Sequence, residues 1–183
     1  MDNVRARTPI FLQDALATEI ERLAEGMEFY LPPSGEKRGK LQVFRQNLPI
    51  PQRPKPDEQL EDDTIDIISG DVEDPIFQCP WGLVKIEGGS VKSPNDRMTI
   101  KVAIAFGIFN AGTSNEGHIE ILNLINRVYE RFAKNPVLAS QYTCSGQFDF
   151  GLQDEDTHPY YFGAISTEFS YLGYQREDCY GIT

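Results

Sequence analysis

A run of apolar side chains at every second position, from residue 98 to residue 109, constrains the fold more than any other feature of this sequence. Its members are Met98, Ile100, Val102, Ile104, Phe106 and Ile108. A period of two is the spacing of a β-strand with one face buried, so the run predicts a long strand. Residues 157–174 repeat the pattern, and the inward positions there are Tyr161, Ile165, Thr167, Phe169 and Tyr171. Two such strands require a sheet with one face covered by other elements.

Two other segments have the period of an amphipathic helix. Thr8 followed by Pro9 is a typical helix start, and the apolar spacing that follows predicts a helix over residues 9–25. The second helix is predicted from an apolar stripe that ends before Asn135 and Pro136. That stripe consists of Ile121, Leu122, Ile125, Val128, Tyr129 and Phe132. The two helices are the expected cover of the sheet.

Shorter patterns predict two hairpins. Residues 81–86 read as a strand that pairs with 98–109, and the turn between them is expected over 88–97. Residues 144–152 alternate, and the turn at 153–159 leads from them into the closing strand. The positions of this strand predicted to face inward are Cys144, Phe148, Phe150 and Leu152. Each hairpin adds one strand to the sheet.

The segment from residue 30 to residue 60 is rich in proline and has little periodic apolar sequence. We predict a long excursion there with one short strand at 41–46, and a long Pro-rich acidic loop at about 47–75. The order of elements predicts an α+β fold, with an antiparallel or mixed β-sheet of about four to five strands packed against two α-helices. A chain of 183 residues suits a single domain over residues 1–183.

The charge of the chain argues against several classes of partner. Twenty-eight acidic and seventeen basic residues give a formal net charge of −11, which repels the phosphates of nucleic acids. The nearest approach to a basic patch, residues 35–40, is interpreted as a solvated loop. No apolar run is long enough to span a membrane, and residues 1–23 lack the uninterrupted apolar stretch of a signal peptide. We therefore predict no association with a membrane.

No residue pattern indicates catalysis or a cofactor. His118 and His158 have no metal-ligand spacing and are interpreted as surface histidines. The three cysteines, Cys79, Cys144 and Cys179, are scattered and odd in number, which argues against a disulfide framework and a zinc site. We predict a protein that is not an enzyme and has no cofactor, no metal site and no catalytic residues.

Five motifs, taken in order, suggest a relationship to a known family. They are LQVFRQNLP (41–49), WGLVKIEGG (81–89), RMTIKVAIAFGIF (97–109), EGHIEILNLINRVYERFAKNPVL (116–138) and FDFGLQDEDTHPYYFGAISTEF (148–169). This ordered set resembles the tail terminator proteins of long-tailed bacteriophages and of particles derived from phage tails. The resemblance covers roughly residues 41–172, and the predicted helix over 9–25 fits the N-terminal helix of that family.

The resemblance implies a structural virion protein. Such a protein forms a ring, expected to be a hexamer, that caps the end of the tail tube, terminates tail polymerisation and provides the surface for head-tail joining. Its expected partners are other copies of itself, the tail tube protein and a head-completion or connector protein, while DNA passes through the lumen without specific binding. The expected location is the tail end or neck of the virion, and the host cytoplasm during assembly.

Two groups of residues follow from this reading as candidate sites. Aromatic residues beyond those that the core needs suit an interface, and the candidate contacts with other subunits or with the tail tube are Phe44, Arg45, Tyr160, Tyr161 and Tyr174. Acidic side chains suit a lumen that lets DNA slide, and the candidate lumen or loop positions are Glu61, Asp62, Asp63, Asp154, Glu155 and Asp156. Two alternatives stay open: another neck or tail-completion component of similar fold, and a small cytoplasmic ligand-binding domain or enzyme.

Overall fold

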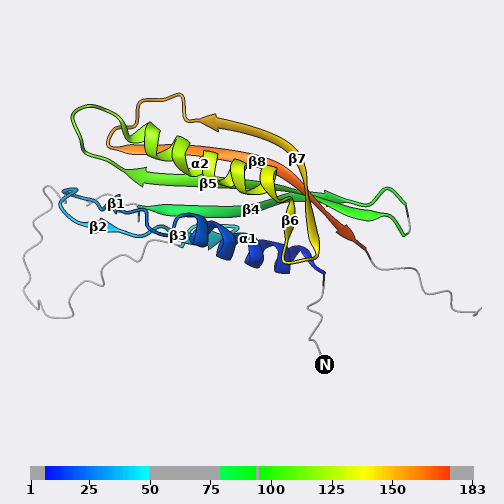
Figure 1. The fold of residues 1–183 in the computed structure, drawn as a ribbon. Helices are drawn as coiled ribbons and strands as arrows, with labels where there is room; N and C mark the ends of the chain where they lie inside the picture. The colour runs from blue at the N-terminus through cyan, green and yellow to red at the C-terminus, as the bar shows by residue number, and fades with distance from the viewer. Residues whose placement is uncertain (1–6, 50–78, 94, 174–183) are drawn as a thin grey trace, which may run out of the picture.

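The computed structural model describes residues 7–49, 79–93 and 95–173, which form one mixed β-sheet with two helices on one of its faces (Figure 1). The elements are α1 (Pro9–Leu23), β1 (Phe29–Tyr30), β2 (Arg38–Gly39), β3 (Gln42–Arg45), β4 (Trp81–Ser90), β5 (Arg97–Phe109), α2 (Gly117–Lys134), β6 (Val137–Leu138), β7 (Tyr142–Leu152) and β8 (Tyr160–Leu172). The predicted α+β class is confirmed.

Strand β5 lies at the centre of the sheet and pairs antiparallel with β4 on one side and β8 on the other. Beyond β8 lies β7, and β6 pairs with the beginning of β7. Beyond β4 lies β3, which is parallel to β4, while β1 and β2 extend the sheet beside the end of β5. Strand β3 therefore borders the sheet on one side, and β7 with the short β6 borders it on the other.

The predicted number of strands was too low, since the described chain holds eight rather than four or five. The three missed strands, β1, β2 and β6, have two residues each, and a segment of that length has no measurable alternation. Of these, β2 and the last residue of β1 lie in the excursion over residues 30–60 that was predicted to hold only one strand. That one, at 41–46, is confirmed as β3. Most of the predicted loop at 47–75 lies outside the described residues.

Helix α1 begins and ends close to its predicted limits. The side chain of Thr8 accepts a hydrogen bond from the Phe11 N–H at 3.1 Å, which caps the first turn. The buried side of α1 packs on β3 and β4. The start of the helix is also tied to β7, because the Tyr142 hydroxyl donates to the Thr8 carbonyl at 2.8 Å and accepts from the Thr8 N–H at 3.1 Å. Contacts distant in sequence therefore hold α1 in place.

Helix α2 lies over β5, β7 and β8 (Figure 1). Two glycines permit its close approach to the sheet: a Cβ at Gly163 of β8 would lie 2.5 Å from Ile121 Cγ2, and a Cβ at Gly117 would lie 2.2 Å from the Tyr161 ring. The apolar stripe of α2 differs from the predicted stripe at two positions. Leu124 is buried although the prediction omitted it, and Tyr129 is 48% exposed although the prediction included it.

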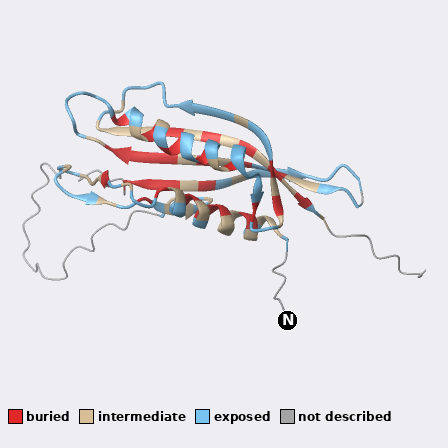
Figure 2. Cartoon of the chain, viewed as in Figure 1, coloured by how far each residue is buried: buried red, intermediate tan, exposed pale blue. Residues whose placement is uncertain are grey.

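The core lies between the helices and the inward face of β5 and β8, as the alternation predicted. Figure 2 shows this layer as buried, whereas much of β7 is exposed. Cys144 is buried and Phe148 packs at the margin of the core. Phe150 and Leu152 also face inward as predicted, but they are not buried, since they are 65% and 39% exposed. They share the inward face of the sheet with Phe148, but α2 covers them only in part.

The hairpin of β4 and β5 is longer than predicted. Strand β4 continues to Ser90, which pairs with Thr99, so the first three residues of the turn expected over 88–97 and its last residue are strand. A bulge between Ile86 and Gly88 interrupts the ladder. Beyond this bulge the hairpin projects past both helices (Figure 1), and its residues are exposed on β4.

Candidate interaction surfaces

Strand β7 has a free outer edge in the part of the chain that the structure describes. Strand β6 covers only its beginning. The Gln153 N–H donates to the Phe162 carbonyl of β8 at 3.0 Å, and this bond fixes the alternation of the antiparallel ladder. The residues whose backbone groups point away from β8 are therefore Phe148, Phe150 and Leu152. A free edge of this kind is a template for pairing with another strand.

A β-bulge explains where the free edge begins. The register of β7 against β8 shifts between Cys144 and Phe148, and Gly146 has a φ of +79°, which glycine adopts at little cost. Such bulges bend a strand and re-aim the side chains that follow. Before the bulge the inward side chains of β7 are buried, and after it Phe148 and Phe150 line an open surface.

An apolar groove with a volume of about 410 Å³ lies beside this edge, between α2 and β7. The residues that line it are Leu122, Ile125, Asn126, Tyr129, Phe148, Phe150 and Ile165. The rings of Tyr129 and Phe148 meet edge to face, with centroids 5.3 Å apart. Both Tyr129 and Phe150 keep about half or more of their surface exposed. Apolar side chains gathered in this way mark an interaction site more often than isolated exposed residues do.

The opposite face of the sheet carries a second hydrophobic cluster and is covered by neither described helix. Its buried members are Cys79, Trp81 and Phe109, with Phe44, Tyr160 and Phe162 among the partly buried residues packed against them. Gly107 makes room for the indole, since a Cβ there would lie 2.3 Å from Trp81. The rings of Phe109 and Tyr160 have centroids 5.4 Å apart. Two predicted contact residues, Phe44 and Tyr160, therefore lie in one intramolecular cluster.

The third predicted contact residue, Arg45, lies on β3 at the other border of the sheet. Its Nε forms an ion pair with Asp14 Oδ1 of α1 at 2.8 Å, and both side chains are exposed by 43% or more. A pair so exposed adds little to stability. A firmer link comes from Gln13, whose amide donates to the Val84 carbonyl at 2.8 Å. Arg45 is thus an exposed cation at the border of the sheet.

The fourth residue, Tyr161, faces the beginning of α2. Its hydroxyl donates to the Asn115 side-chain oxygen, and its ring occupies the space left by the absent side chain of Gly117. Burial and, second, the charge of Asp156 raise the pKa of Tyr161. This side chain positions α2 on β8 within the chain.

Three of the predicted acidic positions, Asp154, Glu155 and Asp156, lie together in the turn between β7 and β8 and are exposed. They border a shallow hollow of about 260 Å³ that also includes His118. The other predicted site residues lie outside the described residues: Tyr174, Glu61, Asp62 and Asp63. The groove has no motif in the sequence, although Phe150 and Tyr129 are predicted there as inward, apolar positions.

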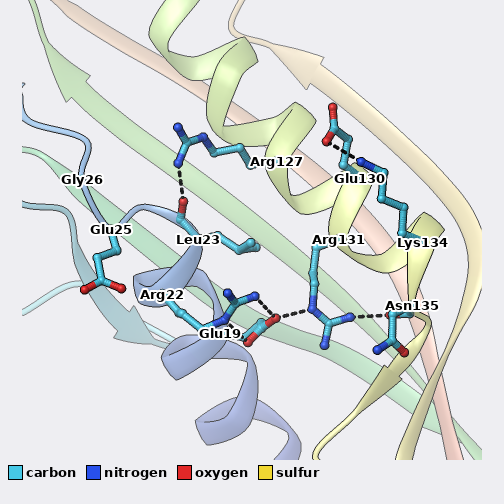
Figure 3. Close-up of a pocket in the computed structure, with 10 residues that line it drawn as sticks. All are labelled: Glu19, Arg22, Leu23, Glu25, Gly26, Arg127, Glu130, Arg131, Lys134 and Asn135. Atoms are coloured by element: carbon cyan, nitrogen blue, oxygen red, sulfur yellow. Dashed lines mark hydrogen bonds and ion pairs between the residues drawn. The ribbon is translucent and has the colours of Figure 1, made fainter.

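A charged cluster joins the two helices on the side away from the groove (Figure 3). Glu19 accepts hydrogen bonds from Arg22, at 2.8 and 2.9 Å, and from Arg131. The bond from Arg22 is the largest cause that lowers the pKa of Glu19. Arg131 also donates to the Asn135 carbonyl, and Arg127 donates to the Leu23 carbonyl at 2.7 Å. These cations are occupied within the chain, so the open cavity of about 840 Å³ is a helix junction rather than an anion site.

The described residues also include potential metal ligands and free thiols. No group of three or more His, Cys, Asp or Glu residues is placed there to hold a metal ion. Cys79 and Cys144 are buried free thiols, and burial raises the pKa of Cys79 to about 12, which leaves it protonated and a poor nucleophile. Neither described helix combines the length and the apolar content needed to cross a membrane.

Compared with known proteins, the sequence matches no protein-family model and no curated protein. A function therefore has to rest on the fold and on the surfaces described above.

Proposed function

We propose that this chain is a structural subunit of a phage tail or tail-like particle, a tail terminator that forms a ring on the end of the tail tube. The ring, expected to have six subunits, stops tail polymerisation and presents the surface that joins the head. Its partners are other copies of the chain, the tail tube protein and a head-completion or connector protein. The protein then resides at the tail end or neck of the virion.

The observation that carries the proposal is the apolar groove beside the free edge of β7. A groove lined by Tyr129, Phe148 and Phe150 is costly to leave in water, at about 25 cal/mol for each Å² of apolar surface. A free strand edge next to it offers unpaired backbone groups as well. Together they suit a contact with another protein chain. Such a contact is what a subunit of a ring requires.

The charge supports the same function. A chain at −11 gives a ring whose field opposes binding of DNA, so the duplex is free to pass through the lumen. The exposed Asp154, Glu155 and Asp156 in the β7–β8 turn are the described candidates for lumen positions. The sequence motifs that resemble tail terminators cover the strands and the helix that form this surface.

The proposal is tested by assembly of the purified protein with tail tubes. We expect a ring by light scattering at high concentration, and negative-stain images with a ring on one end of each tube. Phe150→Ser should abolish the ring, whereas Ile119→Ser, at an exposed apolar site on α2 outside the groove, should leave it intact. If the protein neither oligomerises nor binds tubes at any concentration, the proposed function is wrong.

A second candidate function has one observation in its favour. The volume of the groove, about 410 Å³, lies within the range of small-molecule sites, so a monomeric protein that binds an apolar ligand would also explain the exposed rings. Titration with an apolar fluorescent dye distinguishes the two. Saturable binding to a monomer that ignores tail tubes favours the ligand-binding protein.

A further inference from the structure

We propose that the groove and the free edge of β7 receive a second copy of this chain, which docks head to tail through its β3 and α1. The inference rests on the proposed ring function and specifies which two surfaces meet. In this arrangement β3 of one subunit adds to β7 of the next, so the sheets of neighbouring subunits become continuous.

The strand registers place the two borders of the sheet at the same height. Across the sheet, Arg45 of β3 is level with Val84, Ile104, Ile165 and finally Phe150 of β7. Two residues along, Val43 of β3 is level with Leu152 by the same pairings. The exposed part of the β7 edge and the whole of β3 thus meet without sliding one subunit along the strands. The two strands run in opposite directions, so the new pair is antiparallel.

The backbone groups and the side chains of the two edges also match. On β3, the N–H groups of Gln42 and Gln46 donate to carbonyls on the β4 side at 3.4 and 2.9 Å. By the alternation of a parallel ladder, the backbone N–H and C=O groups of Val43 and Arg45 point away from β4. The backbone groups of their counterparts, Leu152 and Phe150, point away from β8. Each outward residue therefore faces an outward residue, and all four side chains lie on the helix-covered face.

Helix α1 provides a side chain for the groove. Ile10 is 73% exposed, the most exposed large apolar residue described. It lies one turn before Asp14, which pairs with Arg45, and residues four apart share one side of a helix. Ile10 is consequently on the outer flank of α1, beyond β3. When β3 adds to β7 of a neighbour, this flank faces the Tyr129 and Phe148 side of the groove.

Charge favours this pairing over the symmetric alternative in which two β7 edges meet. Residues 35–46, which include β3, contain four cations and one carboxylate, whereas residues 147–158, which include the end of β7, contain four carboxylates and neither lysine nor arginine. Two β7 edges would bring like charges together, while β3 against β7 brings opposite charges together. Complementary charge of this kind selects the partner surface more than it adds affinity. Because the two surfaces differ, repeated docking generates a ring or a filament rather than a closed dimer.

The test is a disulfide between neighbouring subunits. By the same register Gln42 is level with Gln153, and both are exposed. Each points its backbone groups into its own subunit, so they would form a non-hydrogen-bonded antiparallel pair with Cα atoms about 4.5 Å apart, which permits a disulfide. We propose Gln42→Cys with Gln153→Cys, in a background with Cys179→Ser, oxidised at a concentration where the protein is oligomeric.

We expect a ladder of linked oligomers up to the size of the ring on a non-reducing gel. A mixture of the two single variants should give linked dimers only. As a register control, Gln42→Cys with Ser145→Cys uses another exposed residue on β7, roughly 27 Å further along the strand, and should not link. Melting curves of each variant verify that it is folded.

Three results would overturn the inference. Rings without linkage of the double variant would mean that other surfaces meet, and the proposed ring function would stand. Linkage of a single β7 variant with itself would show that two β7 edges pair. A folded double variant that stays monomeric at every concentration would also exclude this docking, and tube binding alone would then decide the proposed function.

Discussion

Replacement of Gly163 by alanine tests whether α2 packs on β8 without an intervening layer. The added Cβ would lie 2.5 Å from Ile121 Cγ2, 2.9 Å from Leu152 Cδ2 and 3.2 Å from the Gly151 carbonyl oxygen. Leu152 is partly exposed and can move aside, whereas Ile121 is fully buried and its methyl group is attached to a branched Cβ. The methyl group of the new alanine therefore has to displace the helix.

Gly151 is the matched control. It lies on β7 beside β8, opposite Ala164, and a Cβ there would have nothing within 4 Å. Overpacking in a well-packed core lowers stability by about 1–3 kcal/mol. Replacing a strand glycine by alanine raises stability by roughly 0.5–1 kcal/mol, and this gain is common to both variants. We therefore expect Gly163→Ala to unfold about 1–3 kcal/mol more easily than Gly151→Ala.

The assay is thermal unfolding followed by circular dichroism under identical conditions. For a domain of this size, 1 kcal/mol corresponds to about 2–4 °C in Tm, so the Tm of Gly163→Ala should lie about 2–12 °C below that of Gly151→Ala. Gly151→Ala itself should melt at or slightly above the wild-type temperature. Equal Tm values for the two variants would refute the direct contact between α2 and β8.

The remaining predictions concern the core and two carboxylates. Phe169→Ala, at a fully buried site, should cost about 3–5 kcal/mol, and Phe148→Ala should cost less in denaturant titrations because Phe148 is only partly buried; equal costs would contradict the burial difference. Glu19 has a lowered pKa, chiefly through its hydrogen bond from Arg22. The ionised Glu19 carboxylate therefore stabilises the folded protein above the unfolded-state pKa, and this contribution is lost as pH falls through the folded-state pKa. Glu19→Gln should therefore lower the Tm at pH 7, and that difference should shrink toward about pH 3. Burial is the largest cause that raises the pKa of Glu120, so stability declines as pH rises through its titration range, and Glu120→Gln should gain Tm relative to wild type between about pH 4 and pH 7. A constant difference across that range would show that Glu120 titrates alike in both states.

The sequence predicted the elements that have enough residues for a period to be visible. Strands β5 and β8 have thirteen residues each, and their alternation placed Phe106 and Phe169 correctly in the core. Helix α1 was predicted from its cap and its spacing. By contrast, a strand of two residues has no period, and the parallel pairing of β3 with β4 depends on contacts between segments far apart in the chain.

The sequence could predict the direction of a side chain but not whether anything covers it. Phe150 shares the inward face with Phe148, as predicted, yet it is 65% exposed because an open groove separates much of it from α2. In the same way, Phe44 and Tyr160 looked like surplus aromatics, but the fold brings them into one cluster around Trp81. Deciding between core and interface at these positions required the positions of the helices.

The bond between Thr8 and Tyr142 has a consequence for synthesis of the chain. These residues are 134 positions apart, and ribosomes add about 5–20 residues per second, so α1 exists for roughly 7–27 s before its partner on β7 has been made. During this time the side of α1 that carries Leu12, Leu16 and Ile20, buried in the finished protein, can pack only on the strands made first, β3 and β4. Attachment of the start of α1 to β7 is therefore expected to be among the last steps of folding on the ribosome.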